Sequence, residues 1–300
     1  MQLFEMVTDE TLRATNRYGT PEFPFAVYLD DLETCKERRV EWHWHRELEF
    51  SAVVSGPVDC LIGAERIRLR PGDGIFLNSG VIHRFEAARG GVLNDVVFAP
   101  EFIAPKDSAV CRRYVEPLVK SGLEYAVLDG EREEHRACLE QLGRVYGQGQ
   151  QSGPLWELRI QTLCMSLWES FFPCICGDLE AQGQPVKKLL QVRLQMMLDF
   201  IRRQYMQHIG LEEIAAAANV SKSEALRCFR LGIQTTPVRY LNEYRLSRAE
   251  ERLLATADKI SAVAWKAGFE SAGYFCRVFK KRYGVTPAEF RSRELPAGGV

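Results

Sequence analysis

The chain has 300 residues, of which 46% are hydrophobic and 26% charged, and its formal net charge is −1. This length predicts about two domains, and the composition excludes a disordered or collagen-like protein. No apolar run approaches the ~18 residues that cross a bilayer, and the N-terminus lacks the basic start and apolar stretch of a secretion signal. We therefore expect a globular, cytoplasmic protein without a membrane partner.

Nine cysteines are scattered along the chain and form no CxxC pair, which argues against a disulfide framework and a zinc ribbon. Free cysteines pack as small hydrophobes, so we expect most of them to be reduced and partly buried. Cys174 and Cys176 are the closest pair and a weak candidate for redox sensing.

Charge is distributed unevenly between the two ends of the chain. Residues 1–200 hold 22 basic and 30 acidic residues, a net −8, whereas residues 201–300 hold 17 and 10, a net +7. A basic segment favours a polyanionic partner, because neutralising phosphates releases counterions. A solvated basic surface would give the same count, so charge alone does not establish DNA binding.

Residues 25–102 consist of short apolar runs broken by Gly, Pro and Asn, a pattern that predicts strands in a barrel or sandwich. Helical periodicity begins near residue 107 and predicts helices over 131–147 and 155–171. The polar stretch 177–186 predicts a linker, and helices separated by short turns are expected from there to about residue 293.

The C-terminal segment contains an internal repeat of about fifty residues, each copy predicting helix, tight turn, helix. At an offset of 49, the matching residues are Ile214 with Val263, Ala215 with Ala264, Ala218 with Ala267, and Val220 with Phe269. At an offset of 50, they are Ala225 with Phe275, Phe229 with Phe279, Thr236 with Thr286, and Pro237 with Pro287. Small alanines allow the two helices to cross closely, and Gly268 supplies the permissive turn of the second copy.

The second helix of each copy presents a polar, basic outer face, with Ala225, Cys228 and Phe229 turned inward in one copy and Phe275, Val278 and Phe279 in the other. A helix of this width fits the major groove of B-DNA, where arginine can bind guanine. A single copy would more often be an ordinary helical hairpin, but two copies with a basic bias predict binding to double-stranded operator DNA. The residues expected to contact DNA are Lys222, Ser223, Glu224, Arg227, Arg230, Ser271, Ala272, Tyr274, Arg277, Lys280 and Lys281.

This segment resembles the AraC family of bacterial transcription regulators, whose DNA-binding region is two helix-turn-helix units joined by a helix. The resemblance covers about residues 186–293 and is most specific in WKAGFESAGYFCRVFKKRYGVTPAEFR, residues 265–291. The first copy departs from the second at its helix end, where Gln234 stands in place of Gly284.

A run of histidines marks the N-terminal region. Residues 42–50 alternate as in a strand, which would place His43, His45, Glu47 and Glu49 on one face. The run resembles the first motif of the cupin fold, HxHxxxE followed by glycine, at His43, His45, Glu49 and Gly56. The second motif matches at Gly72, Gly80 and His83, with Asn78 where proline is usual.

The two resemblances imply different ligands for the same four residues. In metal-dependent cupins the residues matching His43, His45, Glu49 and His83 hold a divalent ion. AraC regulators, by contrast, commonly use an arabinose-binding-like cupin to enclose a small effector. We favour an organic effector at these residues, with no cofactor and no catalysis, and keep a metal as the alternative. His135 and His208 are expected at the surface.

The sequence therefore predicts an α+β protein, with a cupin-like antiparallel β-barrel and helices over 1–176, a linker over 177–186 and an all-α double helix-turn-helix domain over 187–300. The predicted function is effector-responsive transcription regulation, with a homodimer if the helices over 131–171 pair. Whether binding activates or represses depends on the operator position. Two alternatives are a metal-dependent cupin enzyme fused to a DNA-binding domain and an architectural DNA binder indifferent to small molecules.

Overall fold

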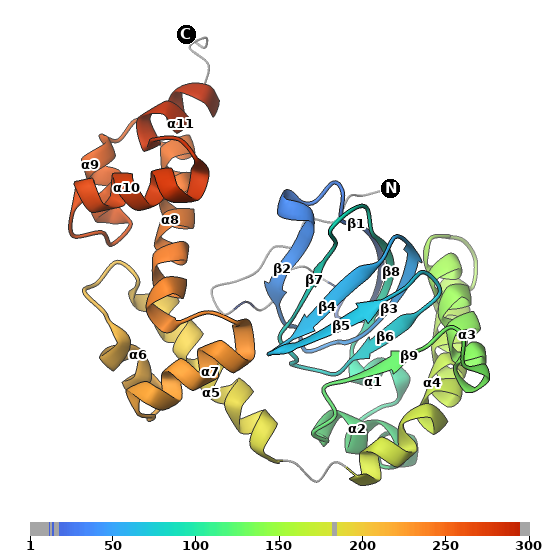
Figure 1. The fold of residues 1–300 in the computed structure, drawn as a ribbon. Coiled ribbons are helices and arrows are strands. Elements are labelled where there is room, and N and C mark those ends of the chain that lie inside the picture. Colours follow the sequence, from blue (N-terminus) through green and yellow to red (C-terminus); the bar gives the residue numbers. More distant parts are fainter. Residues whose placement is uncertain (1–11, 13, 15–17, 182–184, 295–300) are drawn as a thin grey trace. The chain divides into compact units, whose positions relative to one another are not determined.

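The computed structural model describes residues 12, 14, 18–181 and 185–294, and it divides the chain into two compact units, Met1–Gln191 and Val192–Val300. The first unit combines antiparallel sheets with helices, and the second consists of helices (Figure 1). The predicted α+β class is confirmed. The division falls inside a helix, a few residues beyond the predicted linker.

The strands of the N-terminal unit form two antiparallel sheets in the described residues. Their bounds are β1 (Phe25–Asp31), β2 (Arg39–His43), β3 (Leu48–Ser55), β4 (Val58–Ile62), β5 (Glu65–Leu69), β6 (Gly74–Leu77), β7 (His83–Glu86), β8 (Val92–Phe98) and β9 (Tyr125–Leu128). One sheet has the order β1-β8-β3-β6-β9 and the other β2-β7-β4-β5. Among these strands no ladder joins the two sheets, so the expected closed barrel is instead a pair of separate sheets.

Strand β3 shows how residue alternation divides this unit into two cores. Leu48 and Phe50 belong to an apolar cluster with the helices, whereas Val53 packs in a second cluster containing residues of both sheets. Because side chains alternate along a strand, Glu49 and Ser51 lie on the same face as Val53. A carboxylate and a hydroxyl are thereby buried between two sheets whose other side chains are largely apolar.

The predicted single strand over 42–50 is wrong. Strand β2 ends at His43 and β3 begins at Leu48, with the intervening residues in a bridge and a bend. The strand is interrupted because the backbone of Trp44 forms hydrogen bonds with Leu12 and Ala14 instead of continuing a ladder with the neighbouring strand. Trp44 N donates to Leu12 O, and Ala14 N donates to Trp44 O, both at 2.8 Å.

Helices complete the unit, and two of them pack on the five-stranded sheet (Figure 1). Their bounds are α1 (Pro100–Ile103), α2 (Glu116–Lys120), α3 (Glu133–Gly149) and α4 (Trp156–Ala181), with a short 3-10 turn at Lys36–Arg38 and a π-helical turn at Cys111–Val115. The two helices predicted over 131–147 and 155–171 correspond to α3 and α4. Within the described segments, no helix combines the length and apolarity needed to cross a membrane.

The predicted linker is helical at both of its ends. Helix α4 continues through Pro173 to Ala181, and α5 begins at Pro185. Residues 182–184 of the expected linker lie outside the described residues.

The C-terminal unit contains the two predicted helix-turn-helix copies. The helices are α5 (Pro185–Gln204), α6 (Leu211–Ala217), α7 (Lys222–Ile233), α8 (Pro237–Ala255), α9 (Ile260–Lys266), α10 (Ala272–Tyr283) and α11 (Pro287–Glu294). The two turns share one hydrogen bond at equivalent positions, Val220 N to Ala215 O at 3.1 Å and Phe269 N to Ala264 O at 2.9 Å. The sequence repeat is therefore a structural repeat.

The turns and helix ends of the two copies require the same left-handed backbone but use different residues. Gly268 has φ +84° in the second turn, and Asn219 has φ +52° in the first. Helix α10 ends at Gly284 (φ +77°), whereas α7 ends at Gln234 (φ +53°). Glycine adopts this conformation without the cost that a Cβ imposes, so the first copy is the more strained at its helix end.

We predict that Gly284→Ala destabilises the C-terminal unit by about 1 kcal/mol, because alanine in the left-handed region is strained. An added Cβ at Gly284 would meet no atom within 4 Å, so the cost arises from the backbone alone. The matched control is Gly143→Ala on the exposed side of α3, which also has open space and should stabilise its helix by about 0.5–1 kcal/mol. Thermal unfolding of the full chain measures both. If both variants changed the unfolding temperature by the same amount in the same direction, the backbone argument would be contradicted.

Candidate functional site

The outer faces of α7 and α10 are the first candidate site. Nine of the eleven residues predicted to contact DNA are exposed, while Glu224 and Ala272 are half-buried. The predicted inner residues Ala225, Cys228, Phe229, Phe275 and Phe279 are buried, and Val278 is half-buried. Packing against the unit's own core therefore turns the basic side of each helix outward.

Few acidic side chains pair with the basic side chains of helix α10. Among the described residues no ion pair involves Lys280 or Lys281, and the Arg277 guanidinium lies 5.4 Å from the centre of the Tyr274 ring. Ser271 caps the helix, since its hydroxyl accepts a hydrogen bond from Tyr274 N at 3.3 Å. A helix presented in this way has cationic groups available to an anionic partner.

Helix α7 holds its arginine more tightly. Arg227 donates to both carboxylate oxygens of Glu224, at 2.8 and 2.7 Å, and Arg193 of α5 donates to the same carboxylate at 2.9 Å. These contacts lower the pKa of Glu224, chiefly through the Arg227 hydrogen bond. A DNA contact by Arg227 would have to replace this carboxylate, so α7 offers less free positive charge than α10.

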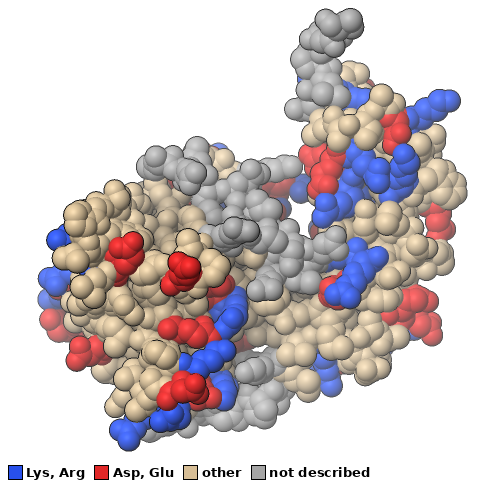
Figure 2. All heavy atoms as spheres, turned by 180° about the vertical axis from the view of Figure 1, so that it is seen from behind, with Lys and Arg blue, Asp and Glu red and all other residues tan. Residues whose placement is uncertain are grey.

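Figure 2 shows one face of the molecule, on which Lys and Arg gather in a patch on the C-terminal unit. On the N-terminal unit in the same view, basic and acidic side chains are interspersed. This distribution agrees with the net +7 of residues 201–300.

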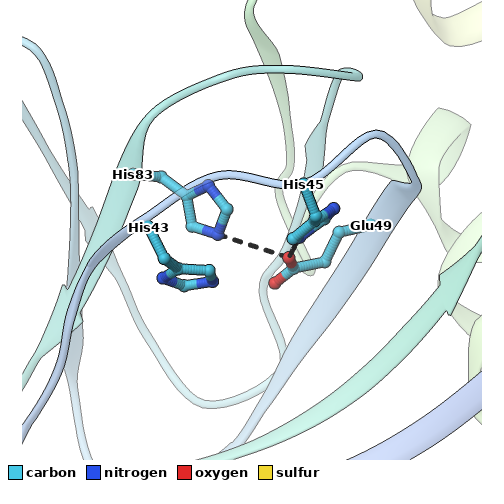
Figure 3. A group of neighbouring side chains, drawn as sticks. All are labelled: His43, His45, Glu49 and His83. Carbon is cyan, nitrogen blue, oxygen red and sulfur yellow. Dashed lines mark hydrogen bonds and ion pairs between the residues drawn. The ribbon is translucent and has the colours of Figure 1, made fainter. Parts of the chain in front are cut away.

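The second candidate site lies between the two sheets of the N-terminal unit (Figure 3). His43 ends β2, His83 begins β7, and the two are register partners in the four-stranded sheet. Glu49 comes from β3 of the other sheet, and His45 from the bend before β3. All four side chains are buried, and their ligand atoms lie within 4.8 Å of one another. The structure thus brings together the four residues of the two predicted motifs, although the strand that was expected to align them is interrupted.

Hydrogen bonds to the backbone orient all three imidazoles in the same way. Nδ1 of His43 lies 2.9 Å from Glu41 O, Nδ1 of His45 lies 3.1 Å from Glu47 O, and Nδ1 of His83 lies 3.0 Å from Val81 O. A carbonyl oxygen only accepts hydrogen bonds, so each Nδ1 is the protonated nitrogen. Nε2 is then the ring nitrogen of each histidine that is left for the cluster.

Glu49 is the acceptor at the centre of this cluster. Its Oε2 lies 2.8 Å from His45 Nε2 and 3.3 Å from His83 Nε2, and its Oε1 accepts a hydrogen bond from Ser51 Oγ at 2.8 Å. Burial would raise the pKa of Glu49, but interactions with His83 and His45 outweigh it and lower the pKa well below its usual range. Burial, together with the neighbouring His83 and His45, lowers the pKa of His43.

A small cavity adjoins the cluster on the side of His43 and Glu49. Its lining residues are Tyr18, Tyr28, Asp30, His43, Glu49, Phe85, Asp95 and Val97. It has about 260 Å³ of empty space, including its opening to solvent, and leaves room for only about one water-sized body. In this conformation the cavity fits an ion or a water molecule rather than a sugar or an aromatic acid.

Two carboxylates in the cavity wall were missed in the sequence. Burial raises the pKa of Asp30 to about 7, with Glu49 adding to the effect, and burial with the charges of Asp30 and Glu49 raises the pKa of Asp95 well above its usual range. The available signal was a single acid inside a largely apolar strand, Asp95 in VLNDVVF. Sequence alone does not place it near Glu49, because that proximity follows from the pairing of β8 with β3, in which Asp95 is the register partner of Ser51.

The four clustered residues fit a divalent transition-metal ion. Imidazole nitrogens with one carboxylate are suitable ligands for Zn, Fe, Ni or Mn, and backbone carbonyls hold the opposite ring nitrogens as in known histidine metal sites.

The remaining histidines differ from each other. His208 is exposed, as expected, and pairs with Glu270. The surface position expected for His135 is wrong, because this residue is buried on α3. Its Nδ1 accepts a hydrogen bond from Asp129 N at 2.9 Å, so it has a structural partner that joins the helix to the segment before it.

The nine cysteines are free, and five of them are buried. Burial raises the pKa of the Cys174 thiol, which opposes formation of the reactive thiolate. The structure therefore gives no support to redox sensing at Cys174 and Cys176.

Comparison with known proteins identifies both units. The AraC-like ligand binding domain model matches residues 32–102, and the helix-turn-helix domain model matches residues 214–293. The first match covers the sheets that hold the histidine cluster, and the second covers both helix-turn-helix copies.

Three curated relatives illustrate the similarity. The chain is 26% identical over 288 residues to the uncharacterized HTH-type transcriptional regulator YdeC of Bacillus subtilis, covering 95% of this chain and 97% of that protein. It is 28% identical over 98 residues to the lactose operon transcription activator of Staphylococcus xylosus, covering 33% of this chain and 35% of that protein. It is 32% identical over 82 residues to the HTH-type transcriptional regulator MtrA of Neisseria gonorrhoeae, covering 27% of each chain.

The relatives are named as regulators, which sets aside the alternative of a cupin enzyme. An effector-binding unit followed by a DNA-binding unit is the organisation that the sequence predicted. The chain belongs to the AraC family of transcriptional regulators.

Proposed function

We propose that this regulator contacts operator DNA through the outer faces of α7 and α10, and that an effector bound near the buried histidine cluster changes its DNA affinity. The observation that carries the DNA-binding part is the pair of matched helices whose basic faces are turned away from the core. The proposed contacts are Lys222, Ser223, Glu224, Arg227, Arg230, Ser271, Ala272, Tyr274, Arg277, Lys280 and Lys281.

The two helices should contribute unequally. Arg227 is already paired with Glu224, whereas Arg277 is stacked near Tyr274 without a carboxylate partner among the described residues. Exchanging an ion pair for a DNA contact returns less free energy than filling an unpaired site. We infer that α10 supplies more of the affinity than α7.

Effector control requires different affinities in two states. An effector can shift the DNA-competent population only by binding that state more tightly, and coupling between sites is typically about 1–3 kcal/mol. We propose His43, His45, Glu49 and His83 as the effector-binding residues, since they are buried together beside the cavity. An architectural DNA binder would lack this coupling.

Action on operator DNA would place the protein in the cytoplasm.

We also propose a homodimer that pairs through α4. On α4, Leu158 is 60% exposed and Met165 is 39% exposed further along the helix, and Leu155, just before the helix, is 62% exposed. Leu158 and Met165 are seven residues apart and so lie on one side of the helix. Exposed apolar side chains in such a row favour burial against a second copy.

Arg277→Ala should weaken operator binding by about 1–3 kcal/mol if this side chain binds a base. Arg227→Ala should weaken operator binding less, because Arg227 must give up its existing ion pair with Glu224 to contact DNA. The matched control is Arg136→Ala on α3, an exposed arginine paired with Glu133 in the other unit, which should leave DNA affinity unchanged. Mobility shifts with operator and random duplexes measure all three. An unchanged affinity for Arg277→Ala would remove it from the interface.

Leu158→Glu should convert a dimer into a monomer, because a charge in an apolar interface must be desolvated without a partner. Light scattering coupled to size exclusion measures the mass. Val54→Glu is the control, since Val54 is 52% exposed on β3 and outside the proposed interface. A dimer that survives Leu158→Glu, or a wild-type chain that is monomeric at micromolar concentration, would contradict pairing through α4.

A further inference from the structure

The chain between α5 and α6 is bonded to the long helix that joins the two helix-turn-helix copies. Residues 205–208, which we call the junction segment, follow α5 and directly precede the first copy. Arg245 of α8, the helix that leads into the second copy (Figure 1), donates from Nε to Tyr205 O and from Nη2 to Gln207 O, each at 2.8 Å. A single arginine side chain therefore attaches the junction segment to α8.

The turn of the second copy packs directly on the junction segment. A Cβ added at Gly268 would lie 2.2 Å from Tyr205 O and 3.0 Å from Met206 Cα. It would also lie 2.9 Å from Arg245 Nε. The equivalent residue of the first turn is Asn219, which has a similar left-handed φ but carries a side chain. Gly268 is therefore required for the close approach of two backbones as well as for its own conformation.

Two further contacts lie at the same place. The rings of Tyr205 and Tyr244 pack edge to face, with centres 5.2 Å apart. His208 pairs with Glu270 of the second turn, but the two side chains are 87% and 68% exposed, so this pair contributes little. The specific part of the contact is thus the Arg245 hydrogen bonds and the close approach at Gly268.

This contact closes a loop through the C-terminal unit. The chain runs from the junction segment through α6, α7, α8 and α9 to the turn at Gly268, which packs back on the junction segment. Two copies joined by α8 alone could turn relative to each other when that helix bends or twists, whereas a second connection fixes their angle. Recognition groups need positions held within about 0.5 Å and 10–20°.

We propose that Arg245 and Gly268 are positioning residues that fix the distance and angle between α7 and α10, so that the protein selects operators by the separation of two contacted segments as well as by their sequence. This inference rests on the proposed DNA contacts of α7 and α10 and adds a spacing requirement to them. One extra base pair moves the second segment by about 3.4 Å and turns it by about 34° around the duplex. A fixed pair of helices cannot follow this change.

The spacing requirement is tested with the full chain and an operator duplex selected in vitro from a random pool. Methylation protection first identifies the two contacted segments, and duplexes with one base pair inserted or removed between them are then titrated in mobility shifts. We expect the wild type to lose at least about tenfold in affinity for each altered duplex.

Arg245→Met keeps the aliphatic stem and removes both donors. Its loss of affinity for the altered duplexes should be no more than about threefold, because the two helices can then adjust to the new spacing. Its affinity for the unaltered operator should also fall, since the freed copies must be ordered on the DNA. Arg245→Lys retains one donor and should show intermediate spacing discrimination.

Two matched controls separate positioning from general destabilisation. Arg248→Met removes another half-buried arginine of α8, whose partners Tyr244 and Glu251 lie on the same helix, and should keep the spacing discrimination of the wild type. Gly268→Ala and Gly284→Ala both place alanine in the left-handed region, but only the first meets the junction segment. Only Gly268→Ala should relax the discrimination.

Circular dichroism establishes that each variant is folded, and Arg245→Met keeps the proposal falsifiable if Gly268→Ala does not fold. Equal wild-type affinity for all spacings, or undiminished discrimination in Arg245→Met, would overturn the positioning role while leaving the proposed DNA contacts intact. Failure of the wild type to select any duplex, or protection of one segment only, would instead contradict the proposed function.

Discussion

The need to satisfy polar groups buried between two apolar sheets is the constraint on which the N-terminal unit depends. Three imidazoles and Glu49 lie where side chains such as Val53 and Phe85 otherwise exclude water. Backbone carbonyls satisfy one nitrogen of each ring, which leaves the other nitrogen and the carboxylate facing one another. The fold therefore holds the three rings and the carboxylate in fixed positions around one point.

A regulator gains from such an arrangement because the ligand-free state is held at a cost. Burial raises the pKa of Asp95 well above its usual range, so the ionised form of this carboxyl group is costly at its site. A ligand that binds here can therefore change the free energy of the surrounding strands, including β1 and β8, which carry Asp30 and Asp95. Coupling of that energy to a DNA-binding unit on the same chain is the function that the family membership leads us to expect.

The repeat in the C-terminal unit was predictable from the sequence because the same local geometry recurs with the same residue types. Alanines at the helix crossing and serines at the helix starts occur in both copies, and Ser221 and Ser271 cap α7 and α10. The first turn was harder to predict, since Asn219 and Gln234 adopt the left-handed conformations that glycine adopts in the second copy. The local pattern of residues thus located the two helices that we propose to contact DNA.

The buried site was only partly predictable. Motif spacing identified His43, His45, Glu49 and His83, but the interruption at Trp44 depends on pairing with residues 12 and 14, which are distant in sequence. Asp30 and Asp95 join the site through strand pairing, and His135 is buried by packing of α3, so neither follows from local alternation.

The most direct test of DNA recognition by both helices is a methylation-protection footprint of the full chain on an operator duplex selected in vitro from a random pool. We predict protected guanines in two successive major grooves, about 10 base pairs apart for each protomer. Protection confined to one groove would contradict the paired use of α7 and α10.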